Sequence, residues 1–183
     1  MVTISNSLSE DGFLLREGVF SQKTVERLIT AIESLLKDED HEDLLLDERG
    51  HPIKIRYPLS KHPSFLGSLA NPSLIRLVDS LFPDGDAVLT WEDVLVKQPN
   101  SGTEVLVHQD LALQTTEGDV FSIGLSLHDD SHNPVFFLPG SHQSSALTRS
   151  EVQVLGEFAR GSFIPVETKS GDALVHDVRC VHY

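Results

Sequence analysis

The spacing of apolar residues changes near residue 86, and this change constrains the fold more than any other feature of the sequence. Before it, apolar side chains recur at helical spacing after Ser21 and again after Asn71. Ser21 and Asn71 are suitable N-cap residues, and Pro63 and Pro72 suit the first turn of a helix. The segment 37–50 is rich in charge and is interpreted as a solvated connector. We therefore expect residues 1–85 to be mainly helical.

After residue 86 the pattern becomes that of short strands. In residues 120–128 apolar side chains alternate with small or polar ones, which is typical of a half-buried strand. Residues 150–158 are the exception and predict a helix with Val152, Leu155 and Phe158 facing inward. Further strands are expected at 52–60, 87–97, 105–110, 134–138, 163–165 and 172–178. Helices followed by short strands predict an α+β class, and 183 residues suffice for a single domain over 1–183.

The segment His108-Gln109-Asp110 is the first candidate for chemistry. In an extended segment, side chains two residues apart point to the same face, so His108 and Asp110 converge. One imidazole and one carboxylate are two thirds of the set that holds non-haem Fe(II) and leaves positions open for other ligands. A second, distant histidine completes such a set, and His182 is the candidate. Taken alone, the pair is also compatible with a surface pair or a capped turn.

Two other histidines, His176 and His128, are alternative candidates for the metal site. His176 precedes His182 by six residues, so the two share parity and His176 is able to point toward the same face. We interpret His176 as a polar residue of its strand. His128 with Asp129 and Asp130 forms a competing ligand cluster, which we interpret as a turn at a strand end.

The overall charge excludes some classes of partner. With 14 basic and 28 acidic residues the net charge is -14, and such a surface repels nucleic-acid backbones and anionic membranes. No apolar run approaches the roughly 20 residues of a membrane span. The first residues show no secretory signal, and the single cysteine, Cys180, fits a reducing compartment. We therefore expect a cytoplasmic protein that binds neither nucleic acid nor membrane.

Several segments, in this order, resemble the phytanoyl-CoA dioxygenase-like family of Fe(II)/2-oxoglutarate oxygenases. They are GFLLREGVFS, VLVKQPNSG leading into VHQD, IGLSLHDD, FFLPGSHQ and GDALVHDVRCVH. The resemblance implies a double-stranded β-helix (a cupin-like jelly roll) in residues 86–183, with supporting N-terminal helices. It implies Fe(II) as cofactor, held by His108, Asp110 and His182, which are the catalytic centre. It also implies that Lys97 contacts 2-oxoglutarate and that Ser141 and His142 lie close to the cofactor site.

The same resemblance implies a reaction. O2 and the co-substrate 2-oxoglutarate are consumed, a small organic substrate is hydroxylated, and succinate and CO2 are released. Related halogenases have a small residue in place of the carboxylate, so Asp110 favours hydroxylation. The alternatives are a non-enzymatic or inactive oxygenase-like β-sandwich that serves as a binding module, and a cupin-type dioxygenase that does not use 2-oxoglutarate. A requirement for 2-oxoglutarate separates these readings.

Two departures from the family pattern stand out. The family usually has an arginine a little downstream of the distal histidine, which binds the far carboxylate of 2-oxoglutarate, whereas this sequence ends at Tyr183. We therefore expect the natural protein to carry a further C-terminal segment with the last strands of the jelly roll. Gly124 stands where the family commonly has a tryptophan, which predicts a wider or reshaped pocket.

Overall fold

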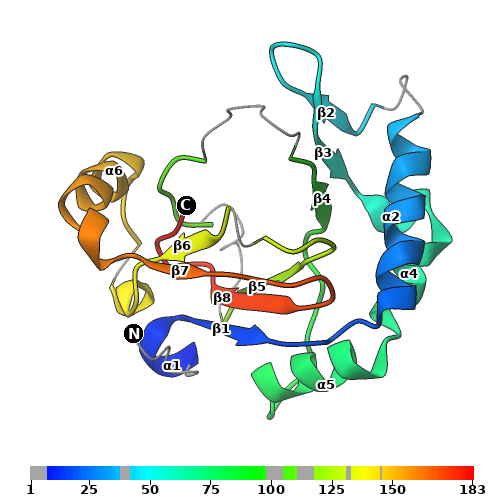
Figure 1. Ribbon diagram of the computed structural model, residues 1–183. Helices are drawn as coiled ribbons and strands as arrows, with labels where there is room; N and C mark the ends of the chain where they lie inside the picture. Colours follow the sequence, from blue (N-terminus) through cyan, green and yellow to red (C-terminus); the bar gives the residue numbers. More distant parts are fainter. Residues whose placement is uncertain (1–7, 38–41, 98–104, 111–117, 131–132, 145) are drawn as a thin grey trace. The chain divides into compact units, whose positions relative to one another are not determined.

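The contacts of the chain divide it into two units, unit 1 with Met1–Val19 and Glu104–Tyr183 and unit 2 with Phe20–Thr103. The computed structural model describes residues 8–37, 42–97, 105–110, 118–130, 133–144 and 146–183 (Figure 1). Helices and strands both occur, in agreement with the expected α+β class. The turn expected at 99–102 lies outside the described residues.

The helices of unit 2 begin where the capping residues predict. The Ser21 hydroxyl accepts a hydrogen bond from the Thr24 amide at 3.3 Å, and Asn71 Oδ1 accepts one from the Ser73 amide at 2.8 Å. Such bonds satisfy amides that have no partner within the helix. Within the described residues, no helix is long and apolar enough to cross a membrane. The helices of this unit are α2 (Gln22–Leu36), α3 (Pro58–Lys61), α4 (Pro63–Leu69) and α5 (Pro72–Leu81).

Unit 2 also contains a small antiparallel sheet, in the order β2 (Leu44–Leu46), β3 (Pro52–Arg56) and β4 (Asp93–Leu95). Strand β2 lies in the segment interpreted as a solvated connector, so that interpretation is wrong for these three residues. The reason is local: Asp47 Oδ1 accepts hydrogen bonds from the amides of Arg49 and His51 at 2.9 and 2.8 Å, which closes a turn between β2 and β3.

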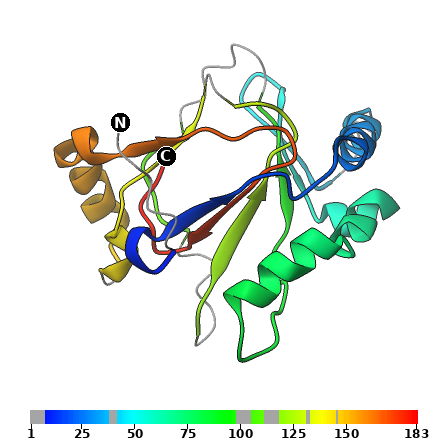
Figure 2. The same ribbon diagram turned by 60° about the horizontal axis from the view of Figure 1, so that its bottom comes forward.

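The first sheet of unit 1 places β8 (Ala173–Asp177) between β1 (Phe13–Arg16) and β5 (Phe121–Leu125). Both pairings are antiparallel, and Figure 2 shows the three strands side by side. All five residues of β8 are buried. A central strand with hydrogen-bonded neighbours on both sides has little freedom, so the side chains of β8 are held in place.

The second sheet of unit 1 pairs β6 (Val135–Phe137) with β7 (Ile164–Val166). The final residues extend this sheet, because His182 forms bridges with Phe137 on one side and with His108 on the other. The strand expected at 105–110 is thus reduced to one bridge at His108 within the described part of that segment. The short helix α1 (Leu8–Asp11) precedes β1.

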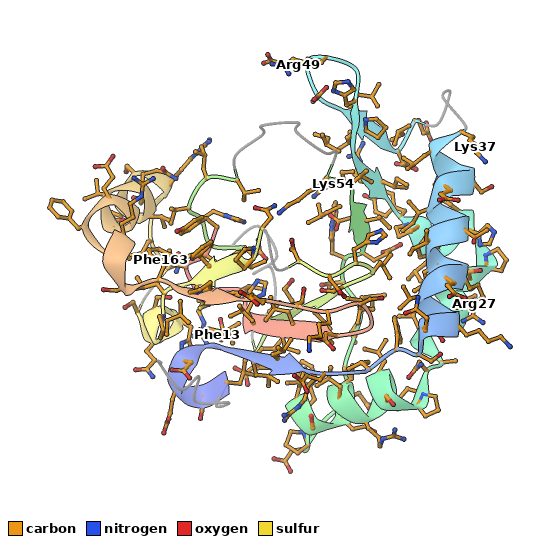
Figure 3. All side chains as sticks on the ribbon, viewed as in Figure 1. Phe13, Arg27, Lys37, Arg49, Lys54 and Phe163 are labelled. Atoms are coloured by element: carbon orange, nitrogen blue, oxygen red, sulfur yellow. The ribbon has the colours of Figure 1, made fainter. Side chains whose placement is uncertain are left out.

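Two apolar clusters form the core of unit 1, and Phe13 and Phe163, labelled in Figure 3, belong to one each. In the first, the ring of Phe13 stacks on Phe137 with centroids 4.6 Å apart, so a residue of the first sheet packs on a residue of the second. In the second, Val152 of helix α6 (Arg149–Phe158) packs with Val181. Cys180 belongs to the first cluster, and Val181 and Tyr183 belong to the second or pack against it, so the clusters hold the chain on either side of His182.

Helix α6 corrects one sequence expectation. Phe158, predicted to face inward, is 87% exposed, whereas Val152 and Gly156 are buried. Each residue of an α-helix is rotated by about 100° about the helix axis relative to the one before it. Phe158, six residues after Val152, therefore lies about 120° from Val152 around the helix. The position on the buried stripe belongs instead to Gly156.

Gly156 leads to a prediction about the packing beside the candidate site. A Cβ atom at this position would lie 2.8 Å from Val107 Cγ2 and 3.1 Å from Val107 Cβ. Overpacking of this kind costs about 1–3 kcal/mol, which outweighs the gain of at most about 1 kcal/mol from replacing glycine in a helix. We expect Gly156→Ala to lower the free energy of unfolding measured with urea.

The matched control is Gly161→Ala, because no atom lies within 4 Å of a Cβ built there. That change is expected to be neutral or slightly stabilising. A Gly156→Ala protein as stable as the Gly161→Ala protein would contradict the close contact with Val107.

Candidate metal centre

The segment 108–110 is fixed by backbone bonds on both sides of its central residue. The His108 amide donates to the His182 carbonyl at 2.9 Å and the His182 amide to the His108 carbonyl at 3.0 Å. The Asp110 amide donates to the Val178 carbonyl at 2.8 Å. Because Val178 and His182 lie just after β8, the end of β8 and the final residues position this segment.

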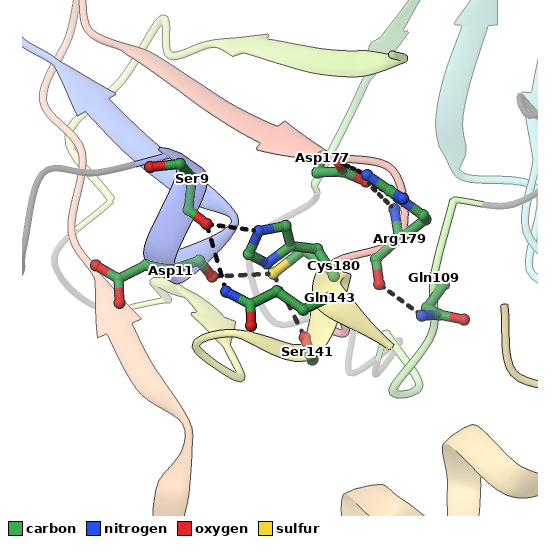
Figure 4. Close-up of polar contacts among 9 residues, drawn as sticks. Ser9, Asp11, Gln109, Ser141, Gln143, Asp177, Arg179 and Cys180 are labelled. Atoms are coloured by element: carbon green, nitrogen blue, oxygen red, sulfur yellow. Dashed lines mark hydrogen bonds and ion pairs between the residues drawn. The ribbon is translucent and has the colours of Figure 1, made fainter. Parts of the chain in front are cut away.

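Gln109, between the two candidate ligands, forms hydrogen bonds through its side-chain amide. Its Nε2 donates to the Arg179 carbonyl at 2.5 Å (Figure 4). Its Oε1 accepts from the Leu147 amide at 3.1 Å. Arg179 is itself held by Asp177, whose carboxylate accepts from Arg179 Nε at 2.9 Å and Nη2 at 2.6 Å. The backbone around the candidate site is thus anchored by side chains as well as by strands.

The structure brings together His108, Asp110 and His182, as the sequence predicts. One ligand atom from each of them lies within 4.8 Å of the others, a spacing that fits a shared metal ion. His108 Nε2 lies 3.6 Å from Asp110 Oδ1, and the rings of His108 and His182 have centroids 4.2 Å apart. His182 is buried, whereas His108 and Asp110 are partly accessible, so the cluster is reachable from one side.

Hydrogen bonds assign the free nitrogen of each ring. His108 Nδ1 lies 2.8 Å from the Leu106 carbonyl, and His182 Nδ1 lies 2.9 Å from the Cys180 carbonyl. A carbonyl oxygen only accepts, so Nδ1 carries the proton in both neutral rings and Nε2 keeps its lone pair. Metal-binding histidines show this arrangement, in which the other ring nitrogen donates to an oxygen.

His176 is the residue of this centre that the sequence interpretation missed. It lies on β8 as expected, but its Nε2 is 3.1 Å from Asp110 Oδ2 and its ring centroid is 4.5 Å from that of His182. The six-residue spacing to His182 was the available signal. An even spacing places two side chains on one face only within a continuous strand. The chain leaves β8 after Asp177 and His182 belongs to the second sheet, so the spacing alone did not place His176 beside His182.

The surroundings set the protonation of the two groups whose pKa values are shifted. Burial raises the pKa of Asp110, but the hydrogen bond from His176 and the electrostatic attraction of the neighbouring histidines outweigh it and lower the pKa to about 2. Burial lowers the pKa of His182 to about 3, and the neighbouring histidines add to this effect. Near neutral pH the centre therefore offers an ionised carboxylate beside a neutral His182, the forms that bind metals.

Ser141 and His142 follow the turn at Gly140, whose φ of 74° suits glycine. Ser141 Oγ donates to the Leu138 carbonyl at 2.6 Å and accepts from the Val181 amide at 2.9 Å, so it supports the residue before His182. His142 is buried, with Nε2 3.2 Å from the Ser9 carbonyl. A role of these two residues at the cofactor stays a prediction.

Lys97 belongs to unit 2 and lies two residues beyond the end of β4, with an exposed side chain. Its predicted contact with 2-oxoglutarate stays a prediction.

Comparisons with known proteins complete the description of the centre. The model of the phytanoyl-CoA dioxygenase (PhyH) family matches residues 8–183. No match was found among curated protein sequences. Among solved structures, AviO1 from Streptomyces viridochromogenes Tue57 is 28% identical with a TM-score of 0.74, over 100% of this chain and 88% of that one.

Two further structures share the fold at lower identity. EctD from S. alaskensis with bound Fe is 22% identical with a TM-score of 0.80, over 96% of this chain and 67% of that one. SnoK, a non-heme alpha ketoglutarate dependent carbocyclase from nogalamycin biosynthesis, is 20% identical with a TM-score of 0.79, over 96% of this chain and 73% of that one.

Proposed function

The chain belongs to the phytanoyl-CoA dioxygenase family, and on this premise we propose that it is an Fe(II)- and 2-oxoglutarate-dependent dioxygenase that hydroxylates a small organic substrate. Two proteins of similar fold support the choice of cofactor and co-substrate: EctD was crystallised with bound Fe, and SnoK is alpha ketoglutarate dependent. The net charge of -14 supports a small molecule rather than a nucleic acid as the substrate.

The observation that carries the proposal is the convergence of His108, Asp110 and His182. Two imidazoles and one carboxylate form the donor set that non-haem Fe(II) oxygenases use. The donors also fit the ion in detail, because each histidine keeps its Nε2 lone pair free while Nδ1 donates to a backbone carbonyl. These three residues are therefore the ones that would hold Fe(II).

The chain's own residues would hold, orient and shield the reacting groups. Bound Fe(II), together with 2-oxoglutarate, supplies the oxidising chemistry, in which O2 is consumed and succinate and CO2 are released. Asp110 supplies a negative charge that persists to low pH, and buried His182 supplies a neutral donor. Phe137, which is fully buried and whose ring lies 5.4 Å from that of His182, would shield the inner side of the centre from water.

Hydroxylation is the outcome that Asp110 favours. A carboxylate ligand occupies a position that a small residue would leave open for another ligand. SnoK, with a similar fold, is a carbocyclase, so product analysis is needed to identify the reaction. Turnover under 18O2 is expected to place one labelled oxygen atom in the oxidised substrate, and an unlabelled product would contradict hydroxylation.

The proposal as a whole is tested without oxygen. We expect Fe(II) followed by 2-oxoglutarate to produce a weak visible charge-transfer band in the wild-type protein. The band requires both the metal and the chelating co-substrate. His108→Ala is expected to show no band, because it removes one of the Nε2 donors.

The other outcomes of this titration are informative. Iron binding without the band would contradict a 2-oxoglutarate site and favour an oxygenase of another type. The absence of iron binding by a folded wild-type protein would favour the binding-module alternative.

Lys97 is proposed to bind a carboxylate of 2-oxoglutarate, through the ammonium group that ends its exposed side chain. We expect Lys97→Ala to weaken 2-oxoglutarate binding by roughly 10-fold. The reason is that one charge-assisted hydrogen bond, worth about 1.5–3 kcal/mol, is lost and solvent compensates part of that loss. The measurement is the 2-oxoglutarate dependence of the same band, with exposed Lys37→Ala as control. Equal affinity in both variants would remove Lys97 from the site.

The remaining organisation is proposed on the same grounds. We infer one domain over 1–183, with the double-stranded β-helix in residues 86–183 and the helices of 1–85 as its support. The family match over 8–183 and the shared fold support this inference. Ser141 and His142 are retained as residues near the cofactor site, and the single Cys180 supports a cytoplasmic location.

A further inference from the structure

His176 differs from the two histidines of the candidate donor set in how it meets its partner. Its Nε2 lies 3.1 Å from Asp110 Oδ2, and an ionised carboxylate only accepts hydrogen bonds. His176 Nε2 therefore carries a proton, whereas in His108 and His182 it is Nδ1 that donates to a backbone carbonyl. The nitrogen of His176 that faces the centre is thus a donor to Asp110 and not a free lone pair for a metal.

The two oxygens of Asp110 consequently have different surroundings. Oδ2 accepts the hydrogen bond from His176, whereas Oδ1 faces His108 Nε2 at 3.6 Å. A carboxylate with one oxygen engaged in this way presents the other oxygen to a metal. Partners that hydrogen-bond a ligating group fix its orientation and tune its affinity.

His176 is itself well placed to hold a fixed orientation. Its side chain is 10% exposed, and its strand β8 is paired on both sides, with Phe13 and Ser122 as the partners of His176. Its ring packs against Phe137 with centroids 5.3 Å apart and against His182 with centroids 4.5 Å apart. Rotation of the ring away from Asp110 would break these contacts within a buried site.

We propose that His176 is a positioning residue that holds Asp110 by its Oδ2 atom, so that Oδ1 alone is directed at the metal position. This inference rests on the proposed function, because a residue that positions Asp110 has this role only if Asp110 binds a metal. It predicts that metal affinity depends on a hydrogen-bond donor at position 176.

The test compares two replacements with Co²⁺ as a redox-stable probe for the metal. His176→Phe keeps a ring but removes the donor, and His176→Gln supplies an amide N–H at a similar distance from the backbone. Calorimetric titration is expected to show an affinity about 10–100-fold lower for His176→Phe, with a changed visible spectrum of bound Co²⁺. His176→Gln is expected to restore most of the affinity and the wild-type spectrum. The exposed His51→Gln is the control for adventitious binding to a histidine.

A second measurement does not depend on the folding of a variant. Nitrogen-15 NMR of the metal-free wild-type protein, labelled in histidine, is expected to show the Nε2–H tautomer for His176 and the Nδ1–H tautomer for His108 and His182. A His176 ring without a proton on Nε2 would overturn the proposal.

The titrations separate the failure of this inference from the failure of the proposed function. Wild-type affinity and spectrum in His176→Phe would overturn the positioning role alone. Equal weakening in His176→Phe and His176→Gln, with both proteins folded, would also overturn it, because the donor would then not matter. A folded wild-type protein that binds no Co²⁺ would overturn the proposed function, and this inference with it.

Discussion

Replacement of Asp110 by alanine is expected to weaken Fe(II) binding by at least about 100-fold. Removing a residue that merely hydrogen-bonds a ligand weakens metal binding by up to about 100-fold, and removing a ligand itself costs at least as much. The change removes the only anionic donor of the set that includes His108 and His182. It also leaves His176 Nε2 without the acceptor that it contacts at 3.1 Å. O2 consumption that depends on 2-oxoglutarate is expected to fall below detection.

Anaerobic calorimetry and an oxygen electrode measure the two effects. Asp84→Ala is the matched control, since Asp84 is exposed in the turn after α5 and its removal is expected to change neither quantity. Iron binding by Asp110→Ala with wild-type affinity would place the metal elsewhere and would remove the main support of the proposed function.

The metal-free protein is expected to lose stability steadily as the pH falls from about 6.5. The pKa of His182 in the folded protein is about 3, below its ordinary value of 6.5. Between these values the unfolded chain binds a proton that the folded chain does not. The free energy of unfolding therefore decreases with falling pH, by about 1.4 kcal/mol per pH unit for this one group.

Asp110 contributes in a separate and lower range. Its pKa is lowered from 3.8 to about 2, so its stabilising contribution is complete only about one pH unit above 3.8 and is lost as the pH falls toward 2. Measurements between about pH 5 and 7 therefore report His182 without a contribution from Asp110. Urea unfolding in this range, with a chelator present, measures the slope.

His182→Asn isolates the effect. Asparagine does not titrate, and its side-chain amide is able to donate to the Cys180 carbonyl that His182 Nδ1 contacts. We expect the pH slope of the variant to be shallower by about one proton, and that of the control His51→Gln to match the wild type. Equal slopes in His182→Asn and the wild-type protein would show that burial does not keep His182 neutral.

Local signals in the sequence were sufficient to predict several elements. Ser21 and Asn71 marked the starts of α2 and α5 because their side chains bond to the first amides of a helix, an interaction within three residues. Alternation in residues 120–128 predicted β5, in which Phe121, Ile123 and Leu125 are partly buried and Gly124 is exposed. The turn predicted at 99–102 lies outside the described part of the chain.

Contacts between distant segments were not predictable in the same way. The motif placed His108 and Asp110 on one face, and that expectation needs only two residues of extended backbone. The bond from His176 to Asp110 depends on how β8 lies relative to residues 66 positions earlier, which no local pattern specifies. Likewise, the inward place of Gly156 depends on Val107, whose side chain leaves no room for a Cβ atom there.

Through Gln109, the position of the candidate centre depends on helix α6, although α6 contributes no donor to the centre. The one side-chain amide of Gln109 joins the Leu147 backbone, just before α6, to the Arg179 backbone, just after β8. Since Gln109 lies between His108 and Asp110 in the chain, its side chain ties both donors to the segment before α6 and to the segment after β8. The backbone bonds between His108 and His182 add a third attachment, so the packing of α6 contributes to the placement of donors that it does not itself supply.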